Sequence, residues 1–244
     1  MDNLNKNIIV TGASKGLGLE ITRVLLEKNY IVYAINRTTT TSLAQLASEF
    51  PSALKVHHMD LAQSSEITSS LKKIFTENVP IAGFVNNAAA AYDDIITNLD
   101  YNRLEEMYRI NVFSPQMITK FVLRNMLLNK LPGSIVHISS ISVHTGYKGL
   151  AMYASTKGAL EAFSKNTARE WGARGIRSNC IVGGFMETEM SSTLSDDQKQ
   201  RIYGRTALKK ATSKESVALA AEFLLSGSSS SITGQNIFVD NGTI

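Results

Sequence analysis

The chain has 244 residues, of which 43% are hydrophobic and 19% charged, a composition that suits one large globular domain with a sizeable core. Its formal net charge is +4, but the lysines and arginines are scattered rather than clustered with aromatic residues, which argues against nucleic-acid binding. The single cysteine, Cys180, excludes an internal disulfide framework, and no Cys/His cluster predicts a metal site. No apolar segment resembles a signal peptide or reaches the length of a membrane span, so we expect a cytoplasmic protein.

Short apolar runs alternate with longer helical patterns along the whole chain. We expect strands at 8–10, 31–35, 54–56, 82–85, 135–138, 176–182 and 237–239. We expect helices at 17–28, 41–50, 67–75, 99–126, 151–171 and 214–225. This alternation is typical of right-handed crossovers, so we predict one α/β domain over 1–244, a Rossmann-type doubly wound sheet of about seven parallel strands. The poorly patterned segment at about 183–204 predicts a lid over the substrate.

The first strand is followed by TGASKGLG at residues 11–18, which opens a helix. Glycines at this position permit a tight turn and a close approach of the backbone, and the helix start offers free N–H groups to a pyrophosphate. A simple turn is the alternative. The order of strand, three glycines and helix favours nucleotide binding.

Asn36 and Arg37 stand at the end of the second strand, where an NAD site places an acid against the ribose. Arg37 could stack on adenine and pair with a 2′-phosphate, and Lys15 could share that charge. Two solvated cations are the alternative interpretation. The pair predicts NADPH rather than NADH.

Tyr153 and Lys157 are four residues apart in a helical pattern, so their side chains share one face. An ammonium beside a phenol favours the ionised form, and we therefore expect a lowered tyrosine pKa and a proton donor. Ser140, at the end of the preceding strand, could hydrogen-bond the same substrate oxygen. The Tyr-x-x-x-Lys spacing alone is common in helices with no catalytic role, so the interpretation depends on the other motifs.

Pro115 follows Asn111 by four residues in a helical pattern, and proline has no N–H for the carbonyl of Asn111. The pattern predicts either a freed carbonyl with a functional role or a plain helix kink.

With these motifs in order, the chain resembles the classical short-chain dehydrogenases/reductases. The resemblance runs from the first strand to the C-terminus through TGASKGLG, Asp60, NNAA at 86–89, Asn111, Ser140 with YASTK, and ITGQNIFVDNG. The segments FSKNTAREWGARGI and FMETEMSSTLSDDQ look most like bacterial 3-oxoacyl-[acyl-carrier-protein] reductases, enzymes of fatty acid biosynthesis.

The resemblance implies a catalytic set of four residues. Tyr153 would be the general acid, Lys157 would lower its pKa and hold the nicotinamide ribose, and Ser140 would orient the carbonyl. Asn111 would hold a water that links the lysine to solvent. The residues implied to contact NADP(H) follow the strands and are Gly12, Ser14, Lys15, Gly16, Leu17, Gly18, Asn36, Arg37, Asp60, Leu61, Asn87, Ala88, Tyr153, Lys157, Gly184, Met186 and Thr188.

Two motifs depart from the family pattern. Gly183-Gly184 replaces the usual Pro-Gly, which predicts a looser start of the lid. Ala89 replaces the last glycine of Asn-Asn-Ala-Gly and adds a methyl group there.

The resemblance implies a carbonyl reductase, and a 3-oxoacyl thioester on acyl carrier protein is one expected substrate. Lys130 and Arg174 are the candidate contacts for an acidic carrier. A free small ketone or alcohol, a sugar and a polyketide-type intermediate are alternatives, while a nucleotide-sugar epimerase or dehydratase is disfavoured. A non-catalytic NADP-sensing regulator is the alternative of another class, and the intact catalytic set argues against it. Family members usually form tetramers, so we expect a homotetramer joined through the helical regions 99–126 and 151–171.

Overall fold

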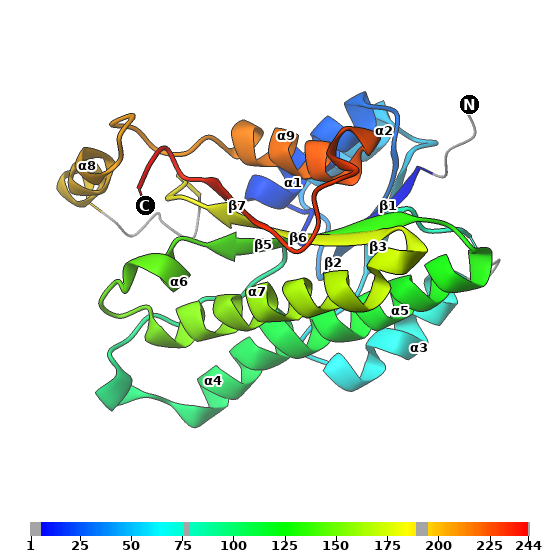
Figure 1. Ribbon diagram of the computed structural model, residues 1–244. Coiled ribbons are helices and arrows are strands. Elements are labelled where there is room, and N and C mark those ends of the chain that lie inside the picture. The colour runs from blue at the N-terminus through cyan, green and yellow to red at the C-terminus, as the bar shows by residue number, and fades with distance from the viewer. Residues whose placement is uncertain (1–5, 76–78, 189–194, 244) are drawn as a thin grey trace.

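The computed structural model describes residues 6–75, 79–188 and 195–243 and shows a central parallel sheet covered by helices on both faces (Figure 1). The strands are β1 (Asn7–Thr11), β2 (Ile31–Asn36), β3 (Leu54–His58), β4 (Gly83–Asn86), β5 (Gly133–Ser140), β6 (Ile176–Gly183) and β7 (Asn236–Val239). The helices are α1 (Gly16–Glu27), α2 (Thr41–Glu49), α3 (Ile67–Ile74), α4 (Tyr101–Tyr108), α5 (Ser114–Asn129), α6 (Ser142–Thr145), α7 (Ala151–Trp171), α8 (Asp196–Arg205) and α9 (Lys214–Leu225).

The strand order is β3-β2-β1-β4-β5-β6-β7, and every pairing is parallel. The order reverses between β1 and β4, so the connections after these strands leave toward opposite faces. Helices α1, α2 and α9 lie over one face, and α3, α4, α5 and α7 over the other (Figure 1). The predicted Rossmann-type sheet is confirmed, and a ligand site is expected at the carboxyl ends of the strands near this reversal.

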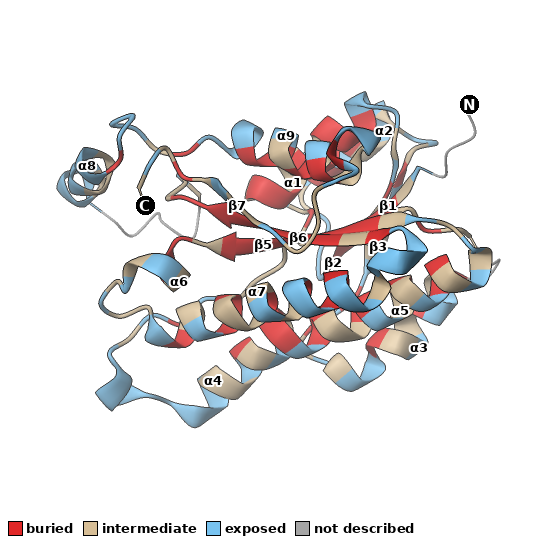
Figure 2. Cartoon of the chain, viewed as in Figure 1, coloured by how far each residue is buried: buried red, intermediate tan, exposed pale blue. Residues whose placement is uncertain are grey.

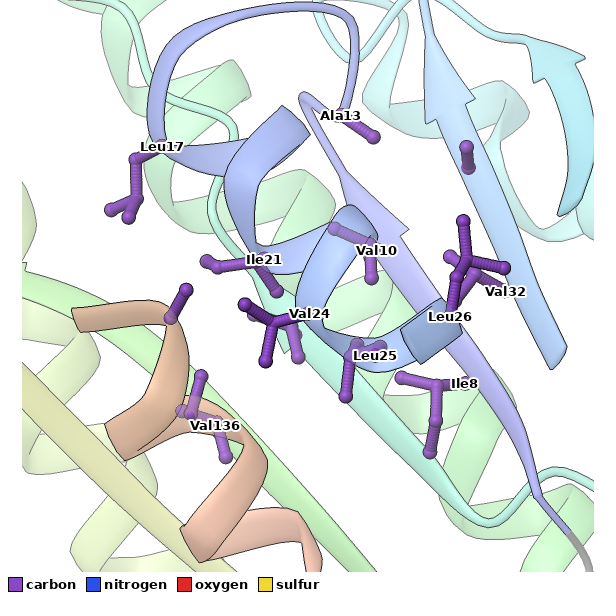
Figure 3. Close-up of a cluster of buried hydrophobic side chains, with 14 of the residues drawn as sticks. Ile8, Val10, Ala13, Leu17, Ile21, Val24, Leu25, Leu26, Val32 and Val136 are labelled. Carbon is purple, nitrogen blue, oxygen red and sulfur yellow. The ribbon is translucent and has the colours of Figure 1, made fainter. Parts of the chain in front are cut away.

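The core has one large hydrophobic cluster on each face of the sheet and a third, small one around Met107, and buried strands lie between partly exposed helices (Figure 2). Ile8 and Val10 of β1 face α1, where they pack with Ile21 and Leu25, as Figure 3 shows. Ile9 points to the other cluster. Burial of each such side chain contributes roughly 1.5–3 kcal/mol to the stability of the fold. Because β1 is buried on both faces, its sequence is a continuous apolar run rather than an alternating one.

All seven predicted strands and the expected helical regions are present, but the long region 99–126 is divided. A π-helical turn at Arg109–Phe113 separates α4 from α5, and the amide of Ser114 donates to the carbonyl of Arg109. Pro115 lies in the first turn of α5, where its missing N–H costs little. The predicted interruption is therefore a widened turn, a feature that is frequent at functional sites.

Two helices were not predicted, α6 and α8. Helix α8 lies in the segment expected to be an unpatterned lid, and most of its residues are polar, so no apolar period marks it. A capping box starts it: the hydroxyl of Ser195 accepts from the amide of Gln198, whose side chain accepts from the amide of Ser195. Residues 189–194 of the expected lid lie outside the described residues. Among the helices of the described ranges, none combines the length and the apolar character that crossing a bilayer requires.

Candidate active site

A cavity of about 920 Å³ opens at the carboxyl ends of β1, β2, β4, β5 and β6. It brings together residues that lie far apart in the sequence. Every residue expected to bind the cofactor lines it: Gly12, Ser14, Lys15, Gly16, Leu17, Gly18, Asn36, Arg37, Asp60, Leu61, Asn87, Ala88, Tyr153, Lys157, Gly184, Met186 and Thr188. Ser140 lines it as well, whereas Asn111 does not.

The loop between β1 and α1 is shaped by its glycines. Gly12 has a φ of +68°, and a Cβ there would lie 2.9 Å from the Cα of Ala88. A Cβ on Gly18 would lie 2.1 Å from the carbonyl oxygen of Gly12. The side-chain amide of Asn87 donates to the carbonyls of Thr11 and Gly12 at 3.0 and 3.2 Å and holds the loop against β4. No side chain caps the start of α1, so this backbone suits a pyrophosphate.

The side chain of Asn36, at the end of β2, indicates that a ligand binds there. Its side chain is buried, and neither amide atom has a hydrogen-bond partner within the described residues. An unsatisfied buried group costs about 1–3 kcal/mol, so a ligand that hydrogen-bonds Asn36 would recover that energy. Arg37 lines the same part of the cavity and is exposed. The residues present therefore fit the adenosine part of a dinucleotide with a charged 2′ substituent.

Lys157 and Tyr153 lie one turn apart on α7. Lys157 as a residue is 2% exposed. Its ammonium donates to the carbonyl oxygen of Ile138 at 2.8 Å and lies 5.6 Å from the centroid of the Tyr153 ring. Burial lowers the pKa of Lys157 to about 8. Lys157 therefore stays mostly charged at neutral pH but gives up its proton more readily than an exposed lysine.

The expected lowering of the Tyr153 pKa is wrong for this structure. Burial raises the pKa of Tyr153 above its ordinary value, and the carboxylate of Asp93 on the cavity wall raises it further. Lys157 does not reverse this shift, since its ammonium is committed to Ile138 and lies over the ring. The phenol therefore holds its proton at neutral pH, the state a proton donor needs.

Ser140 ends β5 and lies on the same cavity wall as Tyr153. Its hydroxyl oxygen accepts from the amide of Ser142 at 3.2 Å, so the oxygen is held at the start of α6 while its own proton can be donated. This geometry suits a donor to a substrate oxygen.

Asn111 lies behind the cavity wall and is fully buried in the π-helical turn. Its side-chain nitrogen donates to the carbonyl of Ala90 at 2.8 Å and to the hydroxyl of Thr156 at 3.0 Å, and its side-chain oxygen accepts from the amide of Ala90 at 2.8 Å. Thr156 precedes Lys157. Asn111 therefore joins the loop after β4 to the catalytic helix, and its expected relay role stays a prediction.

Sequence reasoning missed a polar cluster centred on Glu161, one turn beyond Lys157. Its carboxylate accepts from the hydroxyl of Ser139 and from the side-chain amide of Asn236 at 2.7 Å, and lies 3.1 Å from Nε2 of His144. The partners are 22, 75 and 17 residues away, so no local spacing could reveal them. The cluster ties β5, β7 and α6 to α7, the helix that carries Tyr153 and Lys157.

The glycine pair at 183–184 is held more firmly than expected. The carbonyl of Gly183 accepts from the amide of Ile141 at 3.0 Å, and the amide of Gly184 donates to the carbonyl of Val239 at 2.9 Å. A Cβ on Gly184 would lie 2.7 Å from the Cα of Asp240. The expected looser start of the lid is not seen at these residues, because both are held by backbone hydrogen bonds at the carboxyl end of β6. Ala89 places its extra methyl group on the cavity wall.

The comparisons with known proteins cover nearly the whole chain. The family model described as "Enoyl-(Acyl carrier protein) reductase" matches residues 12–243. The chain is 33% identical over 242 residues to the 3-oxoacyl-[acyl-carrier-protein] reductase FabG of Chlamydia muridarum (strain MoPn / Nigg), an alignment that covers 98% of this chain and 97% of the relative.

Two solved structures are similar over their full length. A gluconate 5-dehydrogenase from Burkholderia cenocepacia J2315 in complex with NADP and tartrate matches with a TM-score of 0.91 at 25% identity, covering 100% of this chain and 96% of that one. A 4-hydroxyisoleucine dehydrogenase complexed with NADH matches with a TM-score of 0.92 at 25% identity, covering 98% of both chains. The predicted resemblance is confirmed: the chain is an oxidoreductase of the short-chain dehydrogenase/reductase family that acts on CH–OH or C=O groups.

Proposed function

We propose that this chain reduces a keto group with NADPH and that Tyr153 supplies the proton. The observation that carries the proposal is that one cavity is lined both by the expected cofactor contacts and by the expected catalytic residues. The former include the glycine loop and Arg37, and the latter are Ser140, Tyr153 and Lys157. The cofactor supplies the hydride when bound, so the chain's own task is positioning and proton transfer.

Each catalytic residue has a distinct task in this proposal. Ser140 donates a hydrogen bond to the carbonyl oxygen and orients it. Tyr153 gives its proton to that oxygen as the carbonyl carbon gains a hydride, which leaves a phenolate. The ammonium of Lys157, 5.6 Å from the centroid of the Tyr153 ring, would offset part of the cost of the buried phenolate, because charges interact more strongly in a buried site. Solvent then returns a proton, and Asn111 would position the path on which it travels.

Arg37 and Lys15 would hold the 2′-phosphate of the cofactor. Both line the cavity at the ends of β2 and β1, and the side chain of Asn36 beside them has no hydrogen-bond partner in the described part of the chain. The likeness to a structure with NADP supports this choice, whereas the likeness to a structure with NADH leaves the other cofactor as the competing candidate.

The substrate has two candidate classes. The relative named 3-oxoacyl-[acyl-carrier-protein] reductase supports a carrier-bound 3-oxoacyl thioester. However, Lys130 precedes β5 and Arg174 precedes β6, so both lie at the amino-terminal edge of the sheet, opposite the cavity. Within one chain they form no basic rim around the active site. A free small carbonyl compound is therefore the second candidate.

We also propose a homotetramer joined through α4, α5 and α7, located in the cytoplasm. Tyr101 at the start of α4 and Leu128 near the end of α5 are 69% and 71% exposed, and Phe113 before α5 is 46% exposed. Large apolar side chains at such exposure favour burial against another copy. Sedimentation equilibrium tests this, since a monomer at micromolar concentration contradicts the proposal.

The activity is tested by following NADPH consumption with an acetoacetyl thioester and with a panel of free ketones and sugar ketones. We expect turnover with at least one of them and a clear preference for NADPH over NADH. Consumption of neither cofactor with any keto compound, despite tight NADPH binding, would favour a cofactor-sensing regulator instead.

A further inference from the structure

Three residues outside both the expected catalytic set and the expected cofactor contacts line the cavity. Tyr147 and Lys148 come from the segment between α6 and α7, and Arg205 ends α8. All three line the cavity that Ser140 and Tyr153 also line. The guanidinium carbon of Arg205 lies 5.9 Å from the centroid of the Tyr147 ring, so the aromatic ring brings the arginine toward the segment that carries Lys148.

The two cations, Lys148 and Arg205, have no carboxylate partner among the described residues. Neither Lys148 nor Arg205 has a carboxylate oxygen within 4 Å anywhere in the ranges that the structure describes. Asp93 is the acidic residue on this part of the wall, and burial raises the pKa of its carboxyl. Both cations line the cavity, and apart from the Tyr147 ring beside Arg205 neither has a partner among the described residues, so both are available to a ligand.

This cationic group is separate from the one assigned to the cofactor. Lys15 and Arg37 follow β1 and β2, whereas Tyr147 and Lys148 follow β5 and Arg205 follows β6. Strands β2 and β5 are three places apart in the sheet, a separation of roughly 14 Å at the usual strand spacing. One phosphate of the cofactor therefore does not account for both groups.

We propose that the substrate carries an anionic group, a carboxylate or a phosphate, on the side remote from the reacting carbonyl, and that Lys148 and Arg205 bind it. Leu150, Phe185 and Ile202 line the cavity nearby and would contact the carbon skeleton between the two polar ends. Tyr147 would hold Arg205 in place. The inference rests on the proposed function and narrows its substrate class.

Matched pairs of probes test the charge of the substrate. Comparing levulinate with methyl levulinate tests whether the enzyme prefers a substrate with a carboxylate. Comparing acetoacetyl phosphopantetheine with acetoacetyl pantetheine tests whether it prefers one with a phosphate. We expect the anionic member of one pair to be reduced with at least about tenfold higher kcat/KM, as expected for a charge-assisted hydrogen bond. The pair that shows the preference identifies the source of the charge. Equal rates within both pairs would overturn the proposal.

Two variants assign the preference to residues. Lys148→Met and Arg205→Gln should each reduce kcat/KM for the preferred anionic probe about tenfold and leave the neutral probe and NADPH affinity unchanged. Arg174→Gln is the matched control, because it removes one exposed arginine charge at the opposite edge of the sheet. An equal loss on both members of a pair would indicate a structural role and contradict the proposal.

Failure of the proposed function is distinguished by a binding measurement. If no probe is reduced, titration calorimetry of malate and, separately, of inorganic phosphate into the NADP-loaded protein still reports on Lys148 and Arg205. Binding of either anion that weakens about tenfold in Arg205→Gln but not in Arg174→Gln supports the anion site without catalysis. Absence of binding of both anions, or equal binding in all variants, overturns it.

Discussion

The ammonium of Lys157 donates a hydrogen bond to the carbonyl oxygen of Ile138 at 2.8 Å. Ile138 lies on β5 two residues before Ser140, so this bond ties the catalytic helix to the strand whose last residue is the expected carbonyl-orienting serine. Glu161, one turn further along α7, makes a second tie to Ser139 on the same strand. The relative position of Ser140 and Tyr153 is thus fixed by two polar contacts beneath the cavity.

Lys157→Met should stabilise the fold and remove turnover. Burial lowers the pKa of Lys157 from 10.5 to about 8. An unfolded lysine keeps its proton up to its ordinary pKa, so between those values the unfolded state binds more protons and stability rises with pH. Below pH 8, keeping the buried Lys157 charged costs the folded protein roughly 3 kcal/mol, and Lys157→Met removes this cost. The variant also loses the hydrogen bond to Ile138, which cancels about 1 kcal/mol of the gain in stability.

Urea denaturation as a function of pH measures this effect. The variant should be more stable at pH 7 by roughly 2 kcal/mol, and its advantage should shrink as pH rises from 8 to 10.5. Lys165→Met on the exposed side of the same helix is the control and should change little. A variant that is less stable than the wild type at pH 7 would show that burial does not strain Lys157.

Gly12→Ala should weaken cofactor binding. It should also lower the stability of the fold, because alanine is strained at the positive φ of this position. The added Cβ would lie 2.9 Å from the backbone of Ala88 on the cavity wall. Gly146→Ala is a matched control, since Gly146 has a φ of +65° and no atom within 4 Å of the added Cβ. Both variants should lose roughly 1 kcal/mol of unfolding free energy from backbone strain, and Gly12→Ala more. Only Gly12→Ala should weaken NADPH binding, measured by fluorescence titration; equal affinities would argue against a close backbone approach there.

Glu161→Gln should destabilise the protein by roughly 1–3 kcal/mol. Ser139, Asn236 and His144 would then share one side-chain oxygen instead of two, and one of them would face the NH₂ group of the glutamine. We expect a lower kcat with NADPH affinity retained, as the cluster positions β5 and α6 against α7. Glu170→Gln near the exposed end of the same helix is the control for loss of one negative charge. A Glu161→Gln protein with wild-type melting temperature and kcat would show that the cluster is dispensable.

Arg37→Gln should reduce the preference for NADPH over NADH about tenfold, since a charge-assisted bond to phosphate is lost. The ratio of kcat/KM for the two cofactors is the measurement, and NADH kinetics should stay nearly constant. An unchanged ratio would mean that the arginine is merely solvated.

Local spacing accounts for what the sequence could predict of this site. The Tyr153 and Lys157 pair follows from helix geometry, and the position of each motif after a strand follows from the rule for parallel sheets. The Glu161 cluster and the cations at 148 and 205 could not be predicted, because the chain brings them together only through the fold. The direction of the Tyr153 pKa was also out of reach, since burial acts through space and outweighs the neighbour that the spacing reveals. Helix α8 was missed because polar residues give no hydrophobic period.

Turnover of Tyr153→Phe tests whether Tyr153 is the proton donor, because the change removes the hydroxyl and keeps the ring beside the Lys157 ammonium. NADPH consumption should be measured with the best keto substrate, alongside NADPH binding to the same protein. The account predicts that kcat falls by a factor on the order of 10²–10⁴, the usual contribution of general acid catalysis, while the Kd for NADPH changes less than about threefold. A Tyr153→Phe variant that turns over at a rate close to the wild type would contradict the assignment of Tyr153 as the proton donor.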